Sequence, residues 1–170
     1  MIHSMAVKAD AGSPAALDRR GRFEPVVAAP KAISPTVQAD LTMRSEIDAI
    51  SPLVDRLMRL IGIFHCEAGV ESDIEIALRE ALANAVVHGN RQDARTKVHI
   101  SCAIHASGVL SIVIKDEGCG FDPAKVPDPT AIENIGCESG RGIHLMKAFM
   151  DDVRFEQGGT QVRLHKVFKP

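Results

Sequence analysis

Three polar side chains that could do chemistry recur at helical spacing in the middle of the chain: Glu80, Asn84 and His88. Residues four apart share one face of a helix, so the stretch 71–90 would align a carboxylate, an amide and an imidazole. An apolar stripe lies about a third of a turn away and consists of Ile74, Leu78, Ala81, Leu82 and Ala85. Taken alone, such a polar stripe is typical of a solvated helix face. Residues further along the chain must therefore decide whether the three act together.

The first of these is Asp116, which ends an apolar segment and is followed by two glycines, Gly118 and Gly120. A carboxylate at that rim can accept a hydrogen bond from the amino group of adenine, and the glycines let the backbone approach a flat ring. An ordinary turn explains the pattern equally well when it stands alone. If the ligand is a nucleotide, the Asn84 carbonyl oxygen suits magnesium held jointly with phosphates. Glu80 could then orient or deprotonate the attacking hydroxyl.

Two later segments add groups of the same kind. Gly140 and Gly142 present bare N–H groups at the start of a predicted helix, which is an anion site suited to phosphates. Arg141 between them carries a charge able to reach an oxyanion, and Ile143 faces inward. Thr160, at the start of a late strand, could hydrogen-bond near the adenine. A solvated arginine and a β-branched strand residue are the simple alternatives for Arg141 and Thr160.

The elements that must position these residues follow from hydrophobic periodicity. The pattern predicts helices from residue 45, over 71–90 and over 140–150, and strands over 37–43, 97–106, 109–115, 153–156 and 160–167. The order of strands and helices does not alternate as in a Rossmann fold. It predicts an α+β two-layer sandwich, in which a mostly antiparallel mixed sheet carries its helices on one face.

Local signals predict how two of the helices begin and end. Pro52 falls in the first turns of the helix from residue 45, so that start should be broken or shifted. Ser72 or Asp73 is expected to cap the helix 71–90, and Gly89-Asn90 is expected to end it as a pair that tolerates left-handed backbone.

Composition excludes several classes of function. The 170 residues carry a formal net charge of −2 and lack Tyr and Trp, which argues against nucleic-acid binding by a basic patch with stacking aromatics. No apolar run approaches the ~18 residues of a membrane span, and no secretory signal is visible. The four cysteines show no CxxC spacing, so neither a disulfide framework nor a zinc site is favoured, and a reducing cytoplasm is the natural location.

Residues 1–36 differ from the rest of the chain. They are rich in Ala, Pro and Ser and show no sustained periodicity, which predicts a flexible tail preceding a domain over 37–170. A docking peptide is the alternative for this segment.

Taken in order, the segments REALANAVVHGN, IKDEGCGFDP, SGRGIHLMKAFMDDV and GGTQVRLHK resemble those of the GHKL ATPases, which share the Bergerat nucleotide-binding fold. The resemblance covers about 37–167 and is closest to the small bacterial anti-sigma-factor serine/threonine kinases. Each segment is weak evidence alone, whereas the ordered set is strong evidence.

The resemblance implies Mg²⁺-ATP binding, sequestration of a sigma factor, and phosphorylation of a serine or threonine on an anti-anti-sigma antagonist protein. By position, it makes Glu80 the catalytic base, Asn84 the magnesium ligand and Asp116 the adenine reader. It makes 123–139 an ATP lid, which contains Cys137, and it allows a homodimer. The nucleotide-binding set that it implies is Asn84, His88, Asp116, Gly118, Gly120, Gly140, Arg141, Gly142, Ile143 and Thr160.

Two other functions stay open on the sequence. One is a histidine-kinase catalytic module, which the HGN ending of the helix, the short lid and the lack of a preceding phosphoacceptor hairpin disfavour. The other is a nucleotide-sensing binding module without transfer activity. Retention of both Glu80 and Asn84 favours the enzyme over this module.

Overall fold

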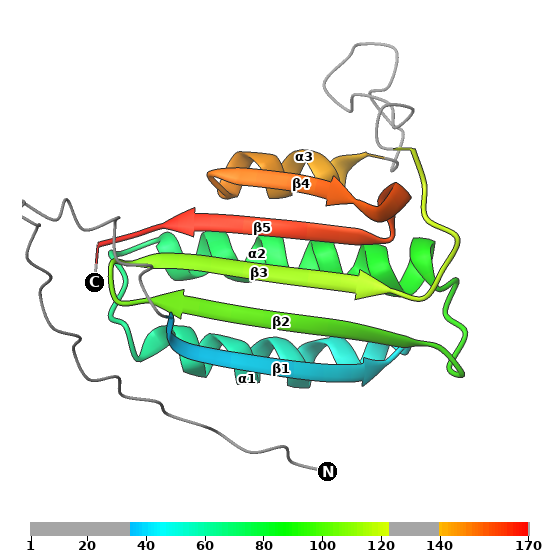
Figure 1. Ribbon diagram of the computed structural model, residues 1–170, viewed down its shortest axis with the longest axis horizontal. Coiled ribbons are helices and arrows are strands. Elements are labelled where there is room, and N and C mark those ends of the chain that lie inside the picture. Colours follow the sequence, from blue (N-terminus) through cyan, green and yellow to red (C-terminus); the bar gives the residue numbers. More distant parts are fainter. Residues whose placement is uncertain (1–34, 123–139, 170) are drawn as a thin grey trace, which may run out of the picture. The chain divides into compact units, whose positions relative to one another are not determined.

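One sheet of five strands carries the fold, in the spatial order β1-β2-β3-β5-β4 (Figure 1). The computed structural model describes residues 35–122 and 140–169, all within the compact unit Ile33–Pro170. The strands are β1 Pro35–Arg44, β2 Lys97–His105, β3 Val109–Asp116, β4 Asp152–Glu156 and β5 Gln161–Val167. Every neighbouring pair is antiparallel, which confirms the α+β prediction and extends its "mostly antiparallel" to all described pairs.

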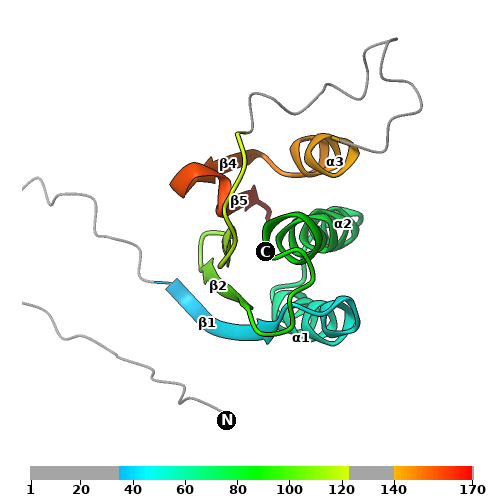
Figure 2. The same ribbon diagram turned by 90° about the vertical axis from the view of Figure 1, so that its right-hand side faces the viewer.

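The helices lie together on one face of this sheet, as Figure 2 shows. They are α1 Ile50–Gly62, α2 Val70–Ala83 with a π-helical continuation at Asn84–Gly89, and α3 Arg141–Phe149. Single 3₁₀ turns occupy Ile47–Ala49 and Gln157–Gly159. The predicted two-layer arrangement is therefore confirmed. The proposed tail over 1–36 and lid over 123–139, with Cys137, lie outside the described residues apart from Pro35 and Thr36, which begin β1.

The core fills the space between the two layers. Along β2 the burial alternates as predicted, with Val98, Ile100, Cys102 and Ile104 inward and His99 and Ser101 exposed. From the helices, Leu57, Ile61, Leu78, Leu82 and Met146 are fully buried against these strands. Each such side chain contributes roughly 1.5–3 kcal/mol through burial. This burial fixes the helix layer against the sheet.

The entry to α1 confirms the predicted disturbance. β1 ends at Arg44, and the buried Ser45 that follows it donates its N–H to the Thr96 carbonyl at 3.2 Å, so no helix begins at Ser45. The regular helix begins only at Ile50, which places Pro52 in its first turn, where the missing N–H costs no hydrogen bond.

The start of α2 corrects a prediction. Neither Ser72 nor Asp73 caps it: the cap residue is Gly69, whose φ of 92° is left-handed and which makes no side-chain bond. Asp73 instead lies 3.4 Å from the Lys166 ammonium on β5. Because α2 already begins at Val70, both Ser72 and Asp73 lie inside the helix and cannot occupy its cap position.

The end of α2 corrects a second prediction, which was that Gly89-Asn90 ends the helix with left-handed backbone. The π-helical turn closes with the Asn90 N–H on the Ala85 carbonyl at 2.8 Å, and the left-handed residues are Arg91 and Gln92. Gly89 keeps an ordinary φ, so it is not there to reverse the chain. A π-helical turn inside an α-helix is uncommon and frequently accompanies a functional site.

None of the helices within 35–122 and 140–169 is long and apolar enough to cross a bilayer.

Candidate functional site

A hollow lies between the end of α2 and the strands β3, β4 and β5. Its walls are mostly apolar and are formed by Ala81, Ala85, Ile114, Phe121, Phe155 and Val162, with Gly89 and Gly159 contributing backbone. The two phenyl rings meet edge to face, with centroids 5.3 Å apart and planes 72° apart. Asn84 and Asp116 are its polar groups. An apolar slot with a few fixed polar groups is the usual form of a site for a planar organic ligand.

Asp116 is the charged group of this hollow and is only 7% exposed. Its Oδ1 accepts the Gly118 N–H at 2.9 Å, and its own N–H donates to the Thr160 carbonyl at 3.0 Å, which fixes the last residue of β3 to the start of β5. Burial raises the pKa of this carboxyl, and the bond from Gly118 opposes the rise. A buried carboxylate is costly to keep, which favours a role in recognition.

Two glycines give the Asp116 carboxylate its space. A Cβ on Gly89 would lie 2.5 Å from Asp116 Cγ, and a Cβ on Gly118 would lie 2.0 Å from the Gly89 carbonyl oxygen. Sequence reasoning expected Gly118 to serve close approach to a ring, and it expected Gly89 to end a helix. Both are required because the helix end and the loop after β3 touch through their backbones.

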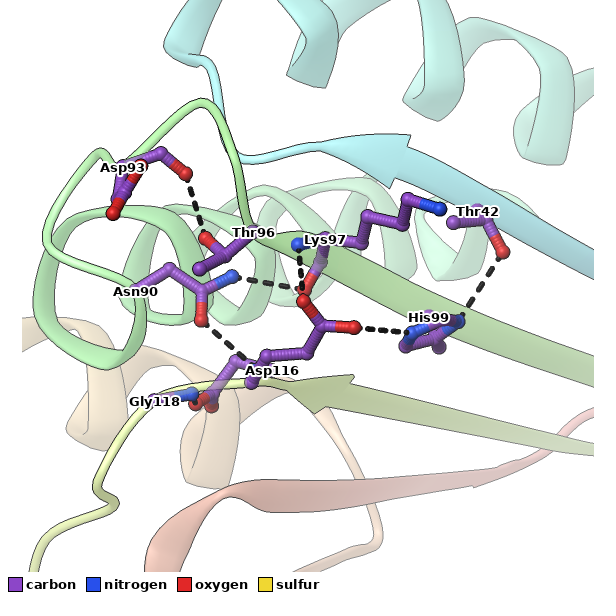
Figure 3. Close-up of polar contacts among 9 residues, drawn as sticks. Thr42, Asn90, Asp93, Thr96, Lys97, His99, Asp116 and Gly118 are labelled. Carbon is purple, nitrogen blue, oxygen red and sulfur yellow. Dashed lines mark hydrogen bonds and ion pairs between the residues drawn. The ribbon is translucent and has the colours of Figure 1, made fainter.

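A ring of hydrogen bonds beside Asp116 was missed by the sequence analysis (Figure 3). Asn90 is 4% exposed; its Nδ2 donates to the Lys97 carbonyl and its Oδ1 accepts the Glu117 N–H, both at 2.9 Å. Glu117 Oε2 in turn accepts the Lys97 N–H at 2.9 Å, while Oε1 lies 3.2 Å from His99 Nε2. The pKa of Glu117 lies below its usual range, chiefly because its carboxylate accepts the Lys97 N–H. An asparagine directly after the helix was the available signal, but it was interpreted only as a helix end.

Glu80 and Asn84 are brought against the first turn of α3. A Cβ on Gly142 would lie 2.6 Å from Glu80 Oε2 and 3.4 Å from Asn84 Nδ2. The carboxylate, the amide and the glycine-rich helix start therefore meet, although Gly142 lies 58 positions beyond Asn84 in the chain. His88 lies within the π-helical turn Asn84–Gly89 and is exposed. The structure thus joins two members of the predicted stripe to the predicted phosphate site and leaves the third at the surface.

Asn84 Nδ2 is buried and has no hydrogen-bond partner in the part of the chain that the structure describes. Buried amides normally find partners, so this one is suited to a bound group. Turning the amide about its last bond exchanges the nitrogen with the carbonyl oxygen, which is a ligand that Mg²⁺ accepts. The residue therefore fits the magnesium role that the resemblance implies.

The other predicted residues lie around this centre. Gly140 caps α3 with a φ of 88°, Arg141 is exposed, and Ile143 is half-buried. Gly120 is left-handed at 72°. The Thr160 hydroxyl donates to the Gln157 carbonyl at 3.1 Å, so it serves the turn before β5.

The fold and the site define a class of protein. Residues 43–166 match the family of histidine kinase-like ATPase domains, and the chain belongs to this family. The predicted resemblance to GHKL ATPases is confirmed.

Within that class, the chain is similar to anti-sigma F factors. It is 32% identical to the anti-sigma F factor of Priestia megaterium over 75% of this chain and 81% of the relative. It is 31% identical to that of Bacillus subtilis (strain 168), with the same coverage. A solved structure of RsbU and RsbW domains from Mycobacterium tuberculosis matches with a TM-score of 0.57 and 18% identity, over 80% of this chain and 33% of that one, which supports the fold alone. The predicted closeness to anti-sigma factors is thereby confirmed.

Proposed function

We propose that this protein is an anti-sigma factor that binds Mg²⁺-ATP and phosphorylates a serine or threonine of an anti-anti-sigma antagonist protein. The observation that carries the proposal is the meeting of Glu80 and Asn84 with the first turn of α3 at Gly142, beside the hollow that contains Asp116. The relatives named anti-sigma F factor support the regulatory part. The geometry supports the catalytic part.

Asp116 and the apolar walls would bind the base. The carboxylate accepts a hydrogen bond from the adenine amino group, while Ile114, Val162 and the two phenyl rings cover the ring system. Guanine presents a carbonyl where adenine presents its amine, so it would repel the same carboxylate. The arrangement therefore favours ATP over GTP.

Asn84 and the start of α3 would bind the triphosphate end. The Asn84 amide oxygen would hold Mg²⁺, which supplies neutralisation of phosphate charge when bound. The N–H groups near Gly140 and Gly142 point out of a helix N-terminus, which attracts anions.

Glu80 would act on the acceptor hydroxyl. In the transfer, the acceptor oxygen bonds to the γ-phosphorus, the bond from that phosphorus to the β-γ bridging oxygen breaks, and ADP leaves. The hydroxyl proton passes to Glu80, one helical turn before Asn84. A sigma factor would bind elsewhere on the surface, so that its sequestration does not require the carboxylate.

The test compares Glu80→Ala and Asn84→Ala with the unmutated protein. We expect Glu80→Ala to retain nucleotide binding and to lower transfer from radiolabelled ATP by ~10²–10⁴-fold, which is the usual contribution of a positioned base. Asn84→Ala should lower metal-dependent ATP affinity and transfer together. Sigma-factor binding should survive Glu80→Ala. Normal transfer by Glu80→Ala would remove the residue from the mechanism, and ATP binding without transfer to any antagonist would support a nucleotide-sensing module.

We further propose a cytoplasmic homodimer. β1 is an edge strand of the sheet, and an exposed edge can pair with a second copy of itself. Light scattering at high micromolar concentration should give twice the chain mass; the mass of one chain would contradict the dimer. A pull-down repeated with ATP and with ADP would identify the sigma factor and the antagonist.

A further inference from the structure

Asn90, Lys97 and Glu117 form a closed cycle of three hydrogen bonds. Asn90 donates to the Lys97 carbonyl, the Lys97 N–H donates to the Glu117 carboxylate, and the Glu117 N–H donates to Asn90 Oδ1. Each of the three bonds measures 2.9 Å. The cycle joins the end of the π-helical turn, the first residue of β2 and the loop that follows β3. These three segments are separated in sequence and are connected here by one buried amide.

The cycle lies directly beside the group proposed to recognise the base. Glu117 follows Asp116, and Gly118 supplies the N–H that holds Asp116 Oδ1. Asn90 follows Gly89, whose Cα faces the Asp116 carboxylate so closely that a methyl group would not fit. The Asp116 carboxylate therefore lies between two segments that Asn90 connects. The helix end contacts it through Gly89, and the loop after β3 is bonded to the Asn90 side chain through the Glu117 N–H. Any change in the separation of these two segments must move the carboxylate.

We propose that Asn90 is a positioning residue for base discrimination: it holds Asp116 at the depth and orientation that distinguish adenine from guanine. The inference rests on the proposed adenine-binding role of Asp116. Asn90 itself is not among the residues that line the hollow, so it acts through Asp116 and Gly118.

A merely structural role for Asn90 predicts different behaviour. Loss of a stabilising hydrogen bond would lower the melting temperature and would weaken ATP and GTP binding by the same factor. A positioning role changes the ratio of the two affinities, because the triphosphate contacts are common to both nucleotides and only the base meets Asp116. The ratio is therefore the informative quantity.

The experiment measures dissociation constants of the full chain for Mg²⁺-ATP and Mg²⁺-GTP by calorimetry, well below the melting temperature. Asn90→Ala removes two bonds of the cycle. Arg95→Ala is the matched control, because it removes an exposed ion pair with Asp93 from the same turn and leaves the cycle intact. Amide hydrogen exchange at Glu117 and Gly118 is measured in parallel, with the Ile112 amide in the middle of β3 as an internal reference.

We expect Asn90→Ala to reduce the preference for ATP about tenfold, the value of roughly one buried hydrogen bond. Exchange at Glu117 and Gly118 should accelerate relative to Ile112, and Arg95→Ala should change neither readout. An unchanged ATP-to-GTP ratio in Asn90→Ala would overturn the inference while the proposed function stands. Equal binding of ATP and GTP by the unmutated protein would instead refute the role of Asp116, and the inference with it.

A second variant keeps the test decisive if Asn90→Ala does not fold. Glu117→Ala removes one bond of the cycle from an exposed side chain and leaves the bond between its N–H and Asn90. We expect a loss of preference of about threefold, smaller because two bonds remain. No change in the ratio would again overturn the inference.

Discussion

The contact between Gly142 and Glu80 allows a substitution that displaces the proposed base without removing it. Gly142→Ala would place a methyl carbon 2.6 Å from Glu80 Oε2, about 0.8 Å short of the 3.4 Å at which ordinary contact begins. Gly142 lies in the first turn of α3 and does not have a positive φ, so alanine suits its backbone. The atom that must yield is the far end of a flexible side chain. The methyl group therefore moves the carboxylate and leaves the fold intact.

The expected magnitudes follow from this displacement. A misplacement of about 1 Å in a catalytic group can cost ~10²-fold in rate, so transfer should fall by that order. Stability should be unchanged or higher by up to about 1 kcal/mol, because alanine favours a helix over glycine. ATP affinity should fall by less than ~10-fold, because the contacts of the adenine ring with Asp116 and with the apolar walls are untouched.

The assay is transfer from radiolabelled ATP to the antagonist, with calorimetric ATP binding and thermal unfolding of each variant. Gly62→Ala is the matched control: it is also a helical glycine facing a glutamate, but its Cβ would lie 3.9 Å from Glu71 Oε1, which is ordinary contact. Transfer should survive that change. The double variant Glu80→Ala/Gly142→Ala should transfer no more slowly than Glu80→Ala alone, because both act through one carboxylate. Normal transfer by Gly142→Ala, or full additivity in the double variant, would refute the argument.

Three further predictions test other parts of the molecule. Asp116→Asn should weaken ATP binding by roughly 1.5–3 kcal/mol in calorimetry, through loss of a charge-assisted hydrogen bond. In thermal unfolding without nucleotide, Asp116→Asn should raise stability at neutral pH. Burial raises the pKa of the folded carboxyl, so the native state loses stability as the pH rises from 3.8 through that raised pKa. The uncharged amide does not carry this cost. Removal of residues 1–34, which precede β1, should leave the melting temperature nearly unchanged, and a large fall would show that the segment packs on the domain. Lys166→Met should cost about 1–3 kcal/mol in denaturant unfolding, because the ammonium donates to the Phe149 carbonyl at 2.6 Å and lies 3.4 Å from Asp73; an unchanged midpoint would contradict this.

The elements of the fold were largely predictable because their signals are local. Alternation in 97–106 and the apolar stripe of 71–90 report which side chains face a core, whatever that core is. The boundaries of the elements were less predictable than their existence. Ser45 does not begin a helix, and its N–H donates instead to the Thr96 carbonyl just after β1 ends. Asp73 does not cap α2 because the helix begins three residues earlier, at Val70, with Gly69 in the cap position.

The site shows the same division. The residue types and their order were sufficient to single out Glu80, Asn84, Asp116 and the glycines, since each carries a recognisable chemical group at a recognisable spacing. The apolar walls at Phe121 and Phe155 carried no such signal, because a phenylalanine that lines a hollow and one that fills a core look alike in a sequence.

The sequence alone therefore determined the class of fold, the family and the polar groups of the site, because periodicity and motif order are properties of neighbouring residues. Only the tertiary structure decided what those groups touch. It showed that Gly89 is a glycine because Asp116 presses against it, not because the chain reverses there. It also showed that Asn90 ties a helix end to the start of β2 and to the loop after β3. Each fact depends on a contact across 27 residues of the chain, between Gly89 and Asp116 and between Asn90 and Glu117. No local pattern encodes how closely two backbones will approach.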